Sequence, residues 1–324
     1  MSDPHFHMGR AVMQDGTTFE MALRPRDIVS GFIQHEGFWE INHPQLLAGL
    51  ADGVLPSSGT LLDIGGNLGW YTYLFAHYNY SVVTVEASPR NVRAIEHTAC
   101  ANPGLASRIT LVRGALIAPD SPQPCFARCG DSNAGNCNVS CGADAAAACA
   151  GDEHARCEAV ATLTLDELLK RLGTSVAPLV AAKLDVEGAE CDILRGGRAL
   201  LRTVRPPFVQ LEGASSRVAA CAVEEAGRHG YAIGPGRGHD RNLVLVDPPA
   251  MGGSPVAARA ACPAGCRAMH LNGWKPLCRF GPPGTRCWTR PRGGWGERPA
   301  NITGRHPPRS CDARGLFRRI VEPG

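Results

Sequence analysis

The chain has 324 residues, of which 44% are hydrophobic and 19% charged, enough to bury the core of one α/β domain with appendages. The formal net charge is +3, but residues 250–324 hold 13 Lys and Arg against 3 Asp and Glu, so the tail is basic and the rest mildly acidic. No apolar run reaches the roughly 20 residues that a membrane-spanning helix needs, and no apolar leader is visible at the start. We therefore expect no membrane span and, by default, a soluble cytoplasmic chain.

The cysteines point the other way. Of the 14 cysteines, six lie within residues 125–157 and five within 262–311, a density typical of an oxidising compartment. Asn-x-Ser/Thr acceptors compatible with the secretory pathway stand at Asn79, Asn138 and Asn301. The compartment therefore stays open at this point.

Residues 60–246 alternate short apolar runs with longer amphipathic ones, which predicts βαβ units and a parallel sheet. We expect a domain over 27–249, preceded by an extension over 1–26. The expected strands lie near residues 60–63, 81–86, 109–115, 180–185, 206–211, 231–233 and 243–246.

Helix start signals stand between these strands. Ser88 can cap a helix whose first turn holds Pro89. Thr164 and Glu167 have the spacing of a capping box, and apolar residues repeat at helical spacing again after Gly188. Right-handed crossovers would place these helices on both faces of the sheet.

Two segments break the alternation. Residues 119–158 form a Cys-rich insertion that three disulfides or a zinc ion could hold, and disulfides are favoured because Cys149 and Cys157 are not closely paired. Residues 250–324 are rich in Pro, Gly and Arg without periodicity, so we expect a loosely structured tail. Cys191 and Cys221 fall within expected helices and are interpreted as buried thiols, and Cys100 is left open.

The first strand runs into a glycine-rich loop. Gly65 and Gly66 lack Cβ atoms where the backbone must turn tightly and approach a ligand, and the following helix offers free N–H groups. The spacing Gly-Gly-x-x-Gly differs from the Gly-x-Gly-x-x-Gly of dinucleotide sites. Asp63, just before the loop, suits a cationic ligand such as S-adenosylmethionine better than a phosphate.

The second strand ends in Glu86, which follows Gly65 by 21 residues. A carboxylate at this spacing commonly accepts hydrogen bonds from the ribose hydroxyls of a nucleotide. Loop and acid together favour a cofactor site over a structural turn.

These residues, together with the string Lys183-Leu-Asp185-Val-Glu187-Gly188-Ala-Glu190, resemble the FkbM family of methyltransferases. The resemblance covers about residues 27–246 without the insertion and the tail. It implies the doubly wound, Rossmann-like class I fold of seven mostly parallel strands, the last antiparallel. It also implies S-adenosylmethionine as cofactor and methylation of a hydroxyl on a sugar, glycan or other small molecule.

The candidate cofactor-binding residues follow the loop and the ends of the next two strands. They are Asp63, Gly65, Gly66, Asn67, Gly69, Trp70, Glu86, Ala87, Gly114 and Ala115. Many class I methyltransferases place an acid for the adenine amine where this chain has Gly114 and Ala115, so backbone groups or stacking would have to read adenine. The segment around Trp39 and Glu40 resembles the family's flap over the cofactor.

The candidate catalytic residues are Asp185, Glu187 and Lys183, at the end of the fourth strand. Either carboxylate could be a general base, although an ion-pair network that only holds the strand end remains the alternative. A metal is the least favoured role, and we expect none.

A second hypothesis is a binding protein that keeps this fold without its chemistry and uses the basic tail on an acidic partner. Arg286, Trp288 and Arg290 interleave cations with an aromatic ring, as single-stranded nucleic-acid surfaces do. A solvated tail is the simpler interpretation, so nucleic acid is not an expected partner.

Overall fold

The computed structural model describes residues 5–47, 55–130, 133, 135–151, 157–173, 178–212, 215–235, 241–245 and 311–323. The aromatic and basic tail residues between 286 and 295 lie outside this part of the chain. Within it, no helix combines the length and the apolar character that crossing a membrane requires.

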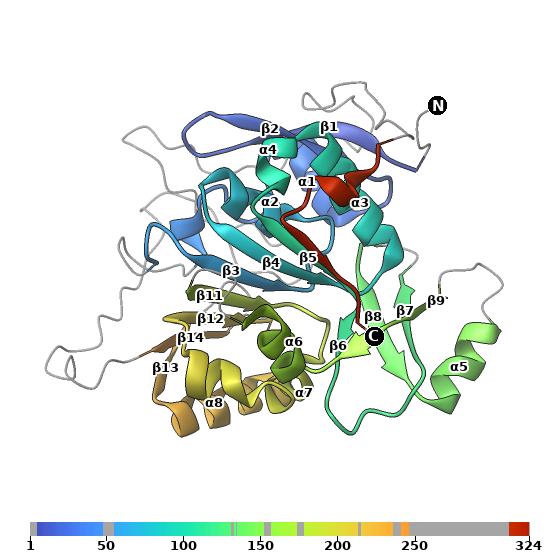
Figure 1. Ribbon diagram of the computed structural model, residues 1–324, viewed down its shortest axis with the longest axis vertical. Helices are drawn as coiled ribbons and strands as arrows, with labels where there is room; N and C mark the ends of the chain where they lie inside the picture. Colours follow the sequence, from blue (N-terminus) through green and yellow to red (C-terminus); the bar gives the residue numbers. More distant parts are fainter. Residues whose placement is uncertain are drawn as a thin grey trace, which may run out of the picture.

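A central eight-stranded sheet organises the domain, in the order β13-β14-β12-β11-β3-β4-β5-β15 (Figure 1). Its strands are β3 (Thr60–Ile64), β4 (Ser81–Glu86), β5 (Ile109–Arg113), β11 (Leu179–Leu184), β12 (Phe208–Leu211), β13 (Tyr231–Pro235), β14 (Arg241–Leu245) and β15 (Arg319–Val321). Among the described strands of this sheet, β14 runs opposite to the other seven. The seven expected strands are confirmed, including the antiparallel last one.

Helices cover both faces because neighbouring strand residues point in opposite directions. In β3, Leu61 belongs to one hydrophobic cluster and Leu62 to the other, and Val82 and Val83 of β4 divide in the same way. The helices are α1 (Ile28–Glu36), α2 (Trp70–His77), α3 (Pro89–Ala101), α4 (Pro103–Ala106), α5 (Ala143–Ala150), α6 (Leu165–Leu172), α7 (Glu190–Arg195) and α8 (Ser216–His229). The expected capping residues of α3 and α6 are confirmed: Ser88 accepts from the N–H of Asn91, and Thr164 and Glu167 form the capping box.

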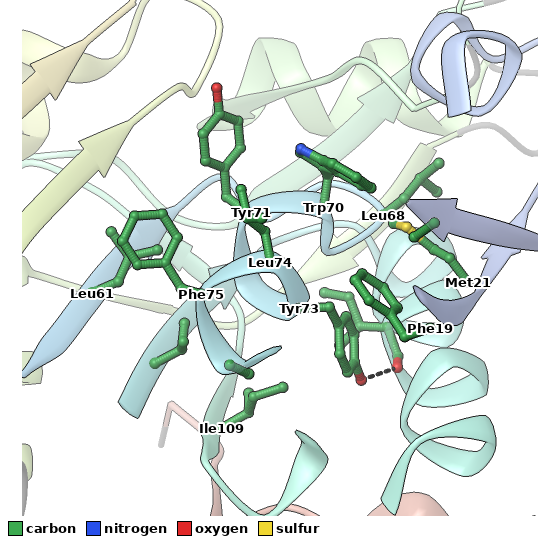
Figure 2. Close-up of a cluster of buried hydrophobic side chains, with 14 of the residues drawn as sticks. Phe19, Met21, Leu61, Leu68, Trp70, Tyr71, Tyr73, Leu74, Phe75 and Ile109 are labelled. Carbon is green, nitrogen blue, oxygen red and sulfur yellow. Dashed lines mark hydrogen bonds between the residues drawn. The ribbon is translucent and has the colours of Figure 1, made fainter. Parts of the chain in front are cut away.

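The N-terminal residues are part of the core. The hairpin of β1 (His7–Val12) and β2 (Thr18–Leu23) buries Phe19 and Met21 beside α2 (Figure 2). In the same cluster, the hydroxyl of Tyr73 donates to the carbonyl of Ile95 at 2.7 Å. The segment expected as an extension therefore packs against the helices that follow the cofactor loop.

The expectation of a loose tail is wrong for residues 311–323. The strand β15 pairs in parallel with β5 at the edge of the sheet (Figure 1), and Cys311 forms a disulfide with Cys100 of α3. Val321 and Phe317 are buried. A sequence without periodicity gave no sign of this strand, because three residues on an existing edge need only backbone hydrogen bonds and one buried side chain.

The insertion is a small disulfide-linked sheet with one helix, α5. Its strands are β7 (Cys125–Cys129), β8 (Cys137–Cys141) and β9 (Cys157–Val160), in the antiparallel order β8-β7-β9. The four-residue spacing within β7 and β8 places both pairs of cysteines opposite each other, giving Cys125–Cys141 and Cys129–Cys137, and Cys149–Cys157 is the third bond. Disulfides, not zinc ligands, are thus what these six cysteines form. The short strands β6 (Ala115–Leu116) and β10 (Thr162–Leu163) pair at its base.

The interpretation of Cys191 and Cys221 as free thiols is wrong. Both lie within helices, as expected, but they form a disulfide that joins α7 to α8. The two cysteines are 30 residues apart, and sequence alone cannot show that two helices on one face of the sheet bring them together.

Candidate functional site

The glycine loop has no room for a Cβ atom at Gly65 or Gly66. Gly65 has φ +83°, and a Cβ there would lie 1.9 Å from the carbonyl oxygen of Asp185. A Cβ on Gly66 would lie 2.4 Å from the Cγ2 methyl of Thr84. The loop is therefore pressed against the ends of β11 and β4, and Gly69 at φ +90° leads into α2.

A cavity of about 370 Å³ opens at this end of the sheet, where β3, β4 and β11 finish. Its size is within the range of small-molecule sites, about 300–1,000 Å³. Most of the expected residues line it: Gly65, Gly66, Asn67, Trp70, Glu86, Ala87, Gly114, Ala115, Lys183, Asp185 and Glu187. Asp63 and Gly69 do not line the cavity.

Asp63 lies behind the cofactor loop and not on the cavity. Its side chain is 1% exposed and accepts a hydrogen bond from the Thr72 hydroxyl at 2.6 Å. Burial raises the pKa of Asp63, and the nearby Lys183 ammonium opposes that rise. The sequence interpretation gave Asp63 direct contact with a cationic ligand. The structure instead places it behind the loop, where it anchors the first turn of α2 to β3.

Glu86 is presented to the cavity by three donors. Its carboxylate accepts from the N–H of Asn67 at 2.7 Å, the N–H of Ser88 at 2.8 Å and the amide of Asn91 at 3.3 Å. Burial raises the pKa of Glu86 to about 7, even though these hydrogen bonds and Arg24 oppose the rise. These contacts hold the carboxyl in one orientation at the end of β4, where it can accept from hydroxyl donors of a ligand.

The Lys-x-Asp-x-Glu-Gly-x-Glu string has a structural explanation. The ammonium of Lys183 donates to Asp185 at 2.7 Å and lies 4.7 Å from the centre of the Tyr71 ring. The buried carboxylate of Glu190 accepts from the N–H groups of Val186 and Gly188. These two hydrogen bonds hold the turn in which Glu187 has φ +58°.

Lys183 stays charged in spite of its burial. Burial favours the neutral amine, but Asp185 and Asp63 together raise the pKa of Lys183 above its ordinary value. The lysine therefore neutralises one of the acids at this strand end. The hydroxyl of Tyr71 donates in turn to Glu40 at 2.5 Å, which ties the flap segment to α2.

Three acids converge beside this lysine. Carboxylate oxygens of Asp185, Glu187 and Glu212 all lie within 4.8 Å of one another. Loss of hydration, followed by the charges of Asp185 and Glu190, raises the pKa of Glu187 to about 7. Loss of hydration and the charges of Asp185 and Glu187 raise the pKa of Glu212 to about 9. Like charges this close cannot all ionise, so the cluster can hold a proton near neutral pH, or a cation.

Two further segments line the cavity, namely the expected flap and the insertion. Trp39 and Glu40 of the expected flap line it, and the indole N–H of Trp70 holds this segment through the Ile41 carbonyl at 3.1 Å. The insertion contributes a second group, namely Asn133, Gly135, Asn136, Cys137 and Val139. Nothing in the spacing of these insertion residues marks them, because only the path of the chain brings them to the cavity.

The chain has low similarity to several solved methyltransferase-related structures. Precorrin-6y C5,15-methyltransferase from Geobacter metallireducens GS-15 shares 13% identity over 58% of this chain and 78% of its own, with a TM-score of 0.33. Aeropyrum pernix fibrillarin with bound S-adenosyl-L-methionine shares 12% over 75% and 100%, with a TM-score of 0.36. The glycopeptide N-methyltransferase MtfA with sinefungin shares 13% over 62% and 83%, with a TM-score of 0.29. Likenesses this distant carry no argument about function.

No curated protein matches the sequence. A family match covers the segment that contains the glycine loop, Glu86 and the acidic string. The model described as the methyltransferase FkbM domain matches residues 63–229, more than half of the chain, and the chain therefore belongs to the FkbM methyltransferase family.

Proposed function

We propose that the protein transfers a methyl group from S-adenosylmethionine to a hydroxyl of a sugar, glycan or other small molecule. Family membership supports methyl transfer, and the cavity supports this cofactor. The Gly65–Gly66 cradle admits a ligand against bare backbone, and Glu86 lies where it can accept from ribose hydroxyls. Acids predominate at the other end, where Lys183, the one cation among the described lining residues, is already paired with Asp185. When bound, the cofactor supplies a methyl group on a positively charged sulfur.

The observation that carries the choice of a hydroxyl acceptor is the arrangement of Glu187. It lines the cavity, in a backbone conformation with φ +58° that is strained for a glutamate. Its neighbour Asp185 is already paired with Lys183. Glu187 is therefore the carboxylate best placed to take the proton of an acceptor hydroxyl.

In the proposed reaction the acceptor oxygen bonds to the methyl carbon, the carbon–sulfur bond breaks, and its electron pair stays on sulfur. The hydroxyl proton passes to Glu187. Lys183 holds the Asp185 carboxyl oriented beside the acceptor through its hydrogen bond, and Glu212 shares the remaining proton of the acidic cluster. The protein's main contribution is alignment of the two reacting atoms and exclusion of water.

The test uses purified protein with methyl-labelled cofactor and fractionated cell extract, followed by identification of the labelled product. Glu187→Gln should then lower kcat about 10²–10⁴-fold, the usual contribution of a general base, while the Kd for S-adenosylhomocysteine stays unchanged. Glu224→Gln, an exposed acid on α8 paired with Arg228, serves as the matched control. Full turnover of Glu187→Gln would remove the proposed base, and label in a nitrogen or carbon acceptor would overturn O-methylation.

A further inference from the structure

The tip of the insertion hairpin lies on the cavity that we assign to the cofactor. Asn133, Gly135 and Asn136 connect β7 to β8, and all three line the cavity with Cys137 and Val139 of β8. They come from a segment that has no place in the alternation of strands and helices, yet they face the same space as the glycine loop and Glu86.

Several hydrogen bonds hold the tip in place. The Asn91 amide donates to the Gly135 carbonyl at 3.0 Å and to Glu86 at 3.3 Å, so one side chain ties the tip to the acid expected at the ribose. The N–H of Ile28 donates to the Asn133 side chain at 3.2 Å. These bonds join the insertion to the end of the cavity that carries Glu86.

The packing at Gly135 is close. A Cβ there would lie 2.1 Å from Oδ2 of Asp27 and 2.7 Å from Oδ1 of Asn67, so a larger residue would require these side-chain oxygens to move. The Cys129–Cys137 disulfide crosses the hairpin just below the tip, where the N–H of Gly130 donates to the Asn136 carbonyl at 3.1 Å. The Sγ of Cys129 also lies 3.5 Å from the hydroxyl of Ser88, the cap of α3. The disulfide thus fixes the tip relative to the strand end that carries Glu86.

Asn136 has chemistry suited to adenine. A carboxamide offers both a donor and an acceptor, which matches the amine and ring nitrogen of adenine. Among the described residues, the Asn136 side-chain carboxamide has no hydrogen-bond partner, whereas its backbone N–H donates to the Asn133 carbonyl at 3.1 Å. The strand end at which an adenine-binding acid would be expected carries Gly114 and Ala115 instead, and both line the same cavity.

We propose that the disulfide-linked hairpin tip forms the adenine-binding wall of the cofactor site, with Asn136 reading the adenine edge and the Cys129–Cys137 bond holding it in position. The inference rests on the proposed function, since it assigns a part of the same cofactor site. It gives the disulfide-linked insertion a role in cofactor recognition.

The first experiment measures the Kd of S-adenosylhomocysteine by calorimetry on the full chain. Asn136→Ala should raise the Kd at least fivefold, because each lost hydrogen bond is worth about 0.5–1.5 kcal/mol. Asn138→Ala, an exposed residue on the adjacent strand that does not line the cavity, should leave the Kd within about twofold, since surface substitutions of this kind have small effects.

The second experiment compares S-adenosylhomocysteine with S-inosylhomocysteine, in which oxygen replaces the adenine amine. The wild-type protein should prefer the adenine ligand, and Asn136→Ala should lose most of this preference, which a purely structural role would not produce. The double variant C129A/C137A should weaken binding of the adenine ligand, whereas C149A/C157A, which removes the disulfide remote from the cavity, should not.

The outcomes separate the two proposals. No binding by the wild-type protein would refute the proposed function. Wild-type binding together with an unchanged Kd and unchanged preference in Asn136→Ala would overturn the adenine wall alone. If C129A/C137A fails to fold, the comparison of Asn136→Ala with Asn138→Ala still decides.

Discussion

At Gly65, both the cofactor loop and the packing of the fold require a residue without a Cβ atom. Gly65→Ala would place a Cβ 1.9 Å from the Asp185 carbonyl oxygen, in a backbone with φ +83°. The left-handed conformation costs an alanine about 1–2 kcal/mol, and overpacking against a neighbour costs about 1–3 kcal/mol. The obstacle is backbone, held by the hydrogen bond from the N–H of Asp185 to the Ile64 carbonyl at 3.0 Å, so it cannot turn aside as a side chain could.

The expected loss is therefore about 2–5 kcal/mol of unfolding free energy, which for a domain of this size lowers the Tm by about 4–20 °C. Urea and thermal unfolding followed by circular dichroism would measure it. Gly104→Ala is the matched control, because that exposed glycine in α4 has nothing within 4 Å of a new Cβ, and the change should be neutral or stabilise by about 0.4–1 kcal/mol. A Tm of Gly65→Ala within about 2 °C of the wild type, less than 1 kcal/mol by the same conversion, would refute this account of the loop.

Two further predictions concern stability. Folding raises the pKa of Glu212 from 4.5 to about 9, so between these pH values the folded protein holds a proton that the unfolded chain releases, and the contribution of Glu212 to stability falls as the pH rises. Glu212→Gln should therefore raise the Tm above that of the wild type at pH 8, and by much less at pH 5. An equal difference in Tm at both pH values would contradict the raised pKa. Replacing both Cys191 and Cys221 by serine should lower stability by about 3–4 kcal/mol, the chain-entropy value for a loop of this length, given the 30-residue separation, and a Tm insensitive to this change and to reductant would show that the bond does not form.

Much of the fold follows from local patterns in the sequence. The alternation of buried and amphipathic runs predicts the seven strands because each parallel strand must bury both faces, and Thr164 with Glu167 predicts the start of α6 because the two side chains satisfy backbone N–H groups within one turn. Gly65 and Glu86 could be assigned to the cavity for the same reason, since a strand end and the turn that follows it are neighbours in sequence and in space.

Tertiary structure decided what depends on distant segments. The sequence around Asp63 does not show whether its side chain faces a ligand or Thr72. The packing of α2 on β3 directs the side chain toward Thr72. The pairing of Cys100 with Cys311 spans 211 residues, and no spacing rule reaches that far. Asn136 belongs to the cavity because a disulfide-linked hairpin folds back over the end of β4. The sequence by itself determined the sheet and its loop, because those depend on local periodicity and backbone geometry. The partners of Asp63, Cys100 and the insertion depend on long-range contacts, which only the folded chain specifies.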